Sequence, residues 1–65
     1  MDDLEALGAV IRRARKDNRL TQLQLAELAA ISERTLRDIE KGRPGVALGA
    51  VAGVAAVLGL RVVVI

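Results

Sequence analysis

The sequence of 65 residues contains no cysteine, no histidine and no aromatic side chain. Without thiols or imidazoles it has no disulfide, no zinc site of the usual kind and no histidine base, which excludes most enzyme chemistry. Its carboxylates show neither a metal-ligand pattern nor an activated nucleophile beside them. Without aromatic rings it lacks the stacking platforms of RNA-recognition and single-strand-binding modules. We therefore expect a protein that is not an enzyme and needs neither a cofactor nor a metal.

Charge is weak overall and unevenly placed. Ten Lys and Arg residues against eight Asp and Glu residues give a net charge of +2, and every charged residue except Arg61 lies between Asp2 and Arg43. Residues 42–45, Gly-Arg-Pro-Gly, separate this charged half from an apolar half that is rich in small residues. The chain begins with acidic residues, the opposite of a secretory signal, so we expect a cytoplasmic protein.

Two amphipathic helices are predicted in the charged half. Apolar residues recur at spacings of three and four after a cap at Asp2, and the helix they indicate ends near Asn18, which tolerates the left-handed conformation. Thr21 and Gln24 then form a capping box, which starts a short second helix that continues to about Ala29.

A third short helix follows after a very short connection. It is capped by Ser32, buries Leu36 and Ile39, and ends at Gly42. Two short helices joined in this way form the helix-turn-helix layout, in which the second helix enters the major groove of DNA.

The run from Thr21 to Gly42, TQLQLAELAAISERTLRDIEKG, starts with Thr-Gln, places Leu-Ala one turn later and finishes with Ile-Glu-x-Gly. It resembles the Xre and phage-repressor family. The resemblance implies an all-α fold, a compact four-helix, lambda-repressor-like helix-turn-helix domain over residues 1–65, with the motif itself at about 21–42. Ala30 departs from the pattern because many relatives carry glycine there, so the turn has to form without a residue that favours positive φ.

The resemblance also implies that the second helix starts against the DNA backbone and that the third faces the groove. The residues expected to contact bases are Ser32, Glu33, Arg34, Thr35 and Asp38. The residues expected to contact phosphates are Gln22, Arg19, Arg37, Lys41 and Arg43. Arg34 is the preferred guanine reader, because a guanidinium can donate two hydrogen bonds to O6 and N7. For Arg19, Lys41 and Arg43 the alternative is a charge that only keeps the protein soluble.

Acidic side chains on the third helix have two interpretations. Glu33 can accept from cytosine, but it lies four residues before Arg37, a spacing that also produces an ion pair within a helix. Arg34 lies four residues before Asp38 and allows a second such pair. Both interpretations stand at this point.

Arg15 lies at the border of the apolar stripe of the first helix, and Glu40 lies beside Ile39 on the third helix. In the family that the sequence resembles, these two positions pair. The resemblance therefore implies a buried structural salt bridge between Arg15 and Glu40, whose disruption leaves one buried charge unpaired.

Residues 46–60 are all apolar or glycine. As a helix the run reaches about 22 Å, short of the ~30 Å hydrocarbon layer, so a fourth helix over residues 47–58 that ends at Gly59 is favoured over a membrane span. The side chains expected to be buried in it are Leu48, Val51, Val54, Ala55 and Leu58. Gly49 and Gly53 each cost about 1 kcal/mol in a helix, and small residues four apart permit close approach, so a second chain is expected to cover this face.

The segment from Arg61 to Ile65 is nearly all β-branched and predicts a strand that has no partner elsewhere in the chain. Pairing with the same strand of a twofold-related copy provides one, so residues 46–65 are expected to form a homodimer through a helix and a two-stranded ribbon. A frayed tail is the alternative. The expected interface residues are Gly49, Gly53, Val62, Val63, Val64 and Ile65.

A fourth helix that ends in Leu-Gly-Leu before a valine-rich strand is also similar to the HipB antitoxin branch of the Xre family. This second resemblance implies an antitoxin of a type II toxin-antitoxin system, which represses its own operon and binds a HipA-like kinase toxin. The predicted function is thus a homodimeric repressor that binds a palindromic operator in double-stranded DNA. The alternatives are an interaction module of the same fold that no longer binds DNA and a small membrane-anchored peptide.

Overall fold

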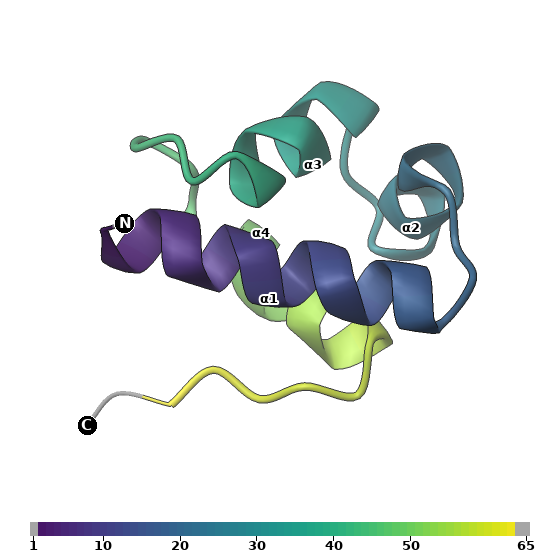
Figure 1. Ribbon diagram of the computed structural model, residues 1–65. Coiled ribbons are helices and arrows are strands. Elements are labelled where there is room, and N and C mark those ends of the chain that lie inside the picture. Colours follow the sequence, from purple (N-terminus) through teal and green to yellow (C-terminus); the bar gives the residue numbers. More distant parts are fainter. Residues whose placement is uncertain (1, 64–65) are drawn as a thin grey trace.

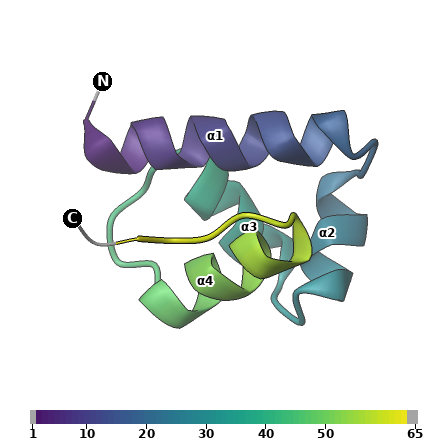
Figure 2. The same cartoon turned by 90° about the horizontal axis from the view of Figure 1, so that it is seen from below.

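Four helices make up the computed structural model, which describes residues 2–63 (Figure 1). They are α1 (Asp3–Asp17), α2 (Gln22–Leu28), α3 (Glu33–Glu40) and α4 (Leu48–Val57). Figure 2 shows α1 along one side of the molecule and α4 along the opposite side, with α3 between them in this view and α2 at the end where α1 finishes. The predicted all-α, four-helix fold is confirmed. Within residues 2–63, no helix combines the length and the apolar character that a membrane crossing requires.

Side-chain caps start the first three helices, as the sequence predicts. Asp2 Oδ1 accepts from the backbone N–H of Glu5 at 2.8 Å, and the Glu5 carboxylate accepts from the backbone N–H of Asp2 at 3.3 Å. Thr21 and Gln24 form the same reciprocal pair, at 3.1 and 2.9 Å. Ser32 Oγ accepts from a backbone N–H of the first turn of α3 at 3.0 Å. These bonds satisfy amide groups that have no carbonyl partner within the helix.

The end of α1 corrects one prediction. Asn18 has a φ of −85°, and the left-handed residue is Arg19, with a φ of 57°. The backbone N–H of Leu20 donates to the carbonyl of Arg15 at 3.1 Å, a bond that spans five residues and needs the left-handed residue just before its donor. The place of a residue in this hydrogen-bond pattern decides which residue adopts the left-handed conformation. The intrinsic preference of Asn18 for that conformation does not.

Ala30 turns the chain between α2 and α3 in the same way, with a φ of 56°. The backbone N–H of Ile31 donates to the carbonyl of Ala26 at 3.0 Å, which closes α2 and directs the chain into α3. A residue with a Cβ pays about 1–2 kcal/mol for a left-handed conformation. The helix-turn-helix corner therefore forms without glycine but carries strain.

Each helix contributes one completely buried side chain to the centre of the core: Ile11, Leu25, Leu36 and Val54. Burial of each is worth about 1.5–3 kcal/mol, so the core holds all four helices together. Of the predicted core of α4, Val51, Ala55 and Leu58 are also buried. The prediction for Leu48 is wrong: this residue lies on the same face as the buried Val51, but it is the first residue of α4 and is 67% exposed.

Two glycines let α1 rest directly on the carboxyl end of α3. A Cβ on Gly8 would collide with the backbone carbonyl oxygens of Ile39 and Glu40. A Cβ on Gly42, which has a φ of 73°, would collide with the backbone of Glu5. This contact fixes the direction of α3 relative to α1.

The segment after α4 returns between α4 and the amino-terminal half of α1 (Figure 2). Residues 61–63 form no strand in the single chain, and Val64 and Ile65 lie outside the described residues. A ribbon that pairs two copies needs a second chain, so the strand over residues 61–65 stays a prediction.

Candidate nucleic-acid interface

Arg15 and Glu40 meet under the surface between α1 and α3. Arg15 Nε donates to Glu40 Oε2 at 2.7 Å and Nη2 donates to Oε1 at 3.1 Å. The side chains are 10% and 3% exposed. Arg15 Nη1 also donates to the carbonyl of Leu20 at 2.8 Å, just before α2. The guanidinium thus ties α1 to α3 and to Leu20 shortly before α2, and its charge is compensated by Glu40 at a site with little exposure to water.

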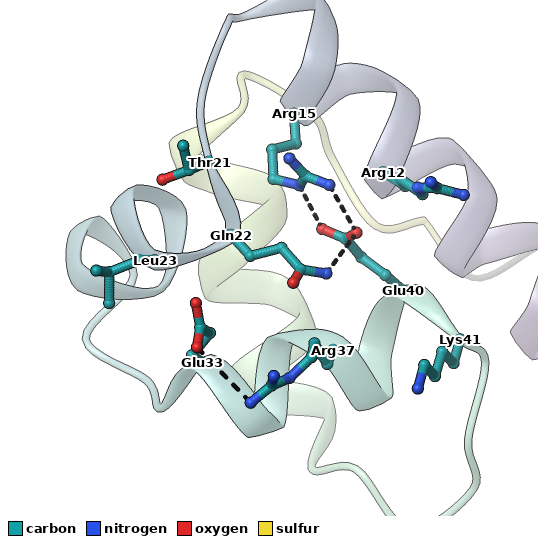
Figure 3. A pocket seen from close by; sticks show the side chains of 9 residues that line it. All are labelled: Arg12, Arg15, Thr21, Gln22, Leu23, Glu33, Arg37, Glu40 and Lys41. Carbon is teal, nitrogen blue, oxygen red and sulfur yellow. Dashed lines mark hydrogen bonds and ion pairs between the residues drawn. The ribbon is translucent and has the colours of Figure 1, made fainter.

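Gln22, the first residue of α2, joins this pair. Its Nε2 donates to Glu40 Oε1 at 3.2 Å, as Figure 3 shows. The three side chains form the floor of a cleft of about 610 Å³ between the first three helices. Arg12 of α1, Arg37 of α3 and Lys41 just after α3 also line the cleft, together with one further acid, Glu33 of α3. A shallow, positively edged cleft above an ordered amide suits a phosphate group.

The exposed side of α3 carries most of the predicted base readers and one further cation, Arg37. Glu33 pairs with Arg37 at 3.7 Å, as its spacing allows. The pair between Arg34 and Asp38 does not form. Asp38 lies 3.5 Å from Arg43 instead, because the chain folds back after Gly42 and the backbone N–H of Arg43 donates to the carbonyl of Asp38 at 3.0 Å.

Arg34 is consequently exposed and has no ion-pair partner among residues 2–63. It lines a second shallow cavity of about 510 Å³ together with Arg37, Asp38, Lys41 and Arg43. The structure therefore brings together the predicted guanine reader and three of the predicted phosphate contacts.

Ser32 and Thr35 are engaged with one another at the start of α3. Ser32 Oγ donates to Thr35 Oγ1 at 2.8 Å and accepts from the Thr35 backbone N–H. The Thr35 hydroxyl retains its own proton as a donor. Arg19 is exposed in the turn before α2 and is not among the side chains that line the cleft.

The sequence-based prediction missed Arg12. This residue lies three positions before Arg15, a spacing that places both on one side of a helix, and it lines the cleft beside Lys41. Arg12 and Lys41 are exposed, and neither has an ion-pair partner in the described part of the chain. The helical position relative to the buried Arg15 is the signal that could have identified Arg12.

Four of the six predicted dimer residues are described by the structure, two in α4 and two in the segment after it. α4 has no polar side chain, yet one face of it is exposed. A Cβ on Gly49 or Gly53 would meet nothing within 4 Å, so neither glycine serves a close approach within this chain. Val62 and Val63 are 37% and 65% exposed. Val64 and Ile65 lie outside the described residues.

Residues 6–64 match the family described as helix-turn-helix domain. Over 56 residues the chain is 43% identical to the immunity repressor protein of Bacillus phage phi105, an alignment that covers 86% of this chain and 39% of that protein. It is 36% identical, also over 56 residues, to the uncharacterized HTH-type transcriptional regulator y4mF of Sinorhizobium fredii (strain NBRC 101917 / NGR234), with 86% of this chain and 74% of that protein covered. The chain thus spans less than half of the phage repressor.

Two solved structures have a similar fold. The clp gene regulator ClgR from Corynebacterium glutamicum superposes with a TM-score of 0.79 and 40% identity, over 89% of this chain and 74% of that chain. The restriction-modification controller protein C.AhdI from Aeromonas hydrophila superposes with a TM-score of 0.81 and 27% identity, over 91% of this chain and 89% of that chain.

Proposed function

Because the chain belongs to the helix-turn-helix family of DNA-binding transcriptional regulators, we propose that it is a transcriptional repressor. It binds a specific sequence of double-stranded DNA, with α3 in the major groove. The observation that carries the proposal is the exposed guanidinium of Arg34, which has no ion-pair partner among residues 2–63 and lies on a helix whose opposite side is anchored in the core by Leu36 and Ile39. A rigid helix with an unpaired cation facing outward is suited to reading base edges.

Base recognition is assigned first to Arg34, which can donate two hydrogen bonds to guanine. Glu33 and Asp38 are already paired with Arg37 and Arg43, at 3.7 and 3.5 Å. Exposed pairs of this kind are worth only about 0–1 kcal/mol, so DNA can replace either partner. Thr35 keeps one hydroxyl proton for a base, whereas Ser32 acts mainly as the cap of α3.

Backbone contacts are assigned to the cleft and its edges. Gln22 is held at the floor, and Arg37 and Lys41 lie along the α3 side. Arg43, just after α3, lines the second cavity together with Arg37 and Lys41, and Arg19 is exposed in the turn before α2. Such contacts release counterions and fix the register of the protein on DNA without reading its sequence.

We further propose that the protein acts as a homodimer on an inverted repeat. The apolar exposed face of α4, the open glycines 49 and 53, and the exposed Val62 and Val63 support this arrangement. Two copies of α3 related by a twofold axis read half-sites one helical turn, about 34–36 Å, apart. Residues 46–65 then serve dimerisation and residues 21–42 serve DNA binding.

Dimerisation is tested by sedimentation equilibrium of the wild type and of Gly53→Leu. A Cβ at this position meets nothing within 4 Å, so the variant should keep its helical content, and the larger side chain should block the second copy and leave a monomer. Ala6→Leu on the exposed side of α1 is the matched control and should remain a dimer. A wild type that sediments as a monomer at concentrations that saturate DNA contradicts the dimer.

A narrower proposal is that this repressor is the antitoxin of a type II toxin-antitoxin system and binds a HipA-like kinase toxin. It is supported by the Leu-Gly-Leu sequence just after α4 and by the valine-rich residues that follow it. Coexpression with a kinase encoded next to it should relieve the growth arrest that the kinase alone causes. A neighbouring locus without any kinase contradicts this role and leaves the repressor function intact.

The alternative function is an interaction module that has lost DNA binding, which the low net charge of +2 favours. A mobility-shift titration against random duplexes, followed by selection of bound sequences, separates the two functions. The repressor should shift random duplexes weakly and a selected inverted repeat at least a thousandfold more tightly. A protein that shifts neither at low salt is the interaction module.

A further inference from the structure

The carboxylate of Glu40 accepts hydrogen bonds from two different side chains. Oε2 accepts from Arg15 Nε at 2.7 Å, and Oε1 is shared between Arg15 Nη2 at 3.1 Å and Gln22 Nε2 at 3.2 Å. The Glu40 side chain is only 3% exposed, whereas Gln22 is half-buried and opens into the cleft. Figure 3 shows the Gln22 amide between Glu40 and the α2 side of the cleft. A salt bridge alone does not need this third bond.

The chemistry of the carboxylate fixes the orientation of the amide. An ionised carboxylate can only accept, so the amide atom that faces Glu40 has to be the nitrogen of Gln22. That nitrogen carries two protons, and the bond to Glu40 uses one of them. A phosphate oxygen is also an acceptor, so the second proton is the one that Gln22 can offer to DNA. Rotation of the amide by 180° would bring its oxygen to Glu40 and remove this arrangement.

The local charges make a carboxylate tolerable beneath a phosphate. Arg15 compensates Glu40 through two bonds, and Arg12 and Lys41 line the same cleft without acidic partners among residues 2–63. Two acids, Glu33 and Glu40, also line the cleft, but four cations do so as well (Arg12, Arg15, Arg37 and Lys41), so its lining keeps a net positive charge.

We propose that Glu40 is a positioning residue for DNA binding: it holds the amide of Gln22 so that one N–H points to the phosphate, and the Arg15–Glu40 pair is part of the interface as well as of the core. This inference rests on the proposed function, because it requires that Gln22 contacts the backbone. An amide that is already oriented loses less conformational freedom on binding than a free one.

A double-mutant cycle on DNA affinity tests the proposal. The variants are Gln22→Ala, Glu40→Gln and the double variant, and fluorescence anisotropy with a labelled duplex is measured at fixed salt after circular dichroism has confirmed folding. Gln22→Ala should weaken binding about tenfold, and Glu40→Gln should weaken it to a similar extent. The double variant should bind no more weakly than Gln22→Ala alone, because the second change has nothing left to position. Additive losses overturn the proposal, and so does a Gln22→Ala variant that binds like the wild type.

A second measurement needs no change at Glu40, in case Glu40→Gln does not fold. The heteronuclear NOE of the Gln22 side-chain amide in the wild-type protein should be close to that of the α2 backbone. A value typical of a freely rotating amide contradicts the proposal. Failure of the proposed function itself is recognised separately, because the wild type would then bind no duplex at low salt.

Discussion

Asp38 and Arg43 form an ion pair at 3.5 Å, so Asp38 does not pair with Arg34, which lies one turn before it on α3. The backbone N–H of Arg43 also donates to the carbonyl of Asp38 at 3.0 Å, which holds the two residues together. Arg34 is left as the unpaired cation on the exposed side of α3, among residues 2–63. The loop after α3 thus determines which side chain is available to read DNA.

Arg34→Ala should therefore cost about 1–3 kcal/mol of binding free energy and relax discrimination at a single base pair of the operator. Competition titrations with operators changed one base pair at a time provide the measurement. Arg37→Ala is the control on the same helix, and it should weaken all sequences to a similar extent because it is assigned to the backbone. If Arg34→Ala keeps the specificity of the wild type, the base reader is another residue.

Arg12→Ala should reduce the dependence of binding on salt. The loss of one phosphate contact lowers the slope of log K against log salt by about 1. Arg13→Ala is the matched control, because Arg13 is the next residue on the same helix but pairs with Asp17 at 3.6 Å and is 82% exposed. Equal slopes for the two variants would mean that Arg12 acts only through the net charge.

Ala30→Gly should stabilise the protein by about 0.5–1 kcal/mol. Glycine adopts the φ of 56° without strain, and part of this gain is offset by the greater freedom of glycine in the unfolded chain. Ala29→Gly is the control, because Ala29 has a φ of −88° and gains nothing from glycine. Chemical denaturation that ranks Ala30→Gly below the wild type would show that the turn carries no strain.

Removal of one partner from the buried pair should be more harmful than removal of both. Arg15→Met leaves the Glu40 carboxylate buried without its cation and should cost about 3–5 kcal/mol of unfolding free energy. The double variant Arg15→Met, Glu40→Leu should recover a large part of this loss, because no unpaired charge remains. Urea denaturation of the three proteins checks the order, and equal stability of the single and double variants would contradict it.

The helices and their caps could be predicted from sequence because they depend on neighbours in the chain. The capping boxes at Asp2 and Thr21 each involve a residue three positions later in the chain. The apolar residues of α4 that were expected at helical spacing in the core are buried there, except Leu48. The apolar pattern that placed Leu48 in the core holds no information on where the neighbouring helices stop.

The parts of the site that sequence reasoning missed depend on contacts between elements. The pair of Asp38 with Arg43 needs the path of the loop after α3, and the role of Gly8 needs the approach of α1 to the carbonyl groups at the end of α3. The bond from Gln22 to Glu40 likewise joins residues that are 18 positions apart. No local spacing rule connects such positions, whereas the Arg15–Glu40 pairing was expected only from the family resemblance.

The most direct test of the central claim is a salt titration of binding to a selected inverted-repeat duplex, with a scrambled duplex of equal length beside it. With five cations assigned to phosphates in each protomer, about ten phosphate contacts form in a dimer, and affinity should fall by about a thousandfold or more between about 50 and 200 mM salt. At every salt concentration the inverted repeat should be bound more tightly than the scrambled duplex. Affinity for the inverted repeat that is unaffected by salt, or equal affinity for both duplexes throughout, would contradict a repressor that reads DNA through α3.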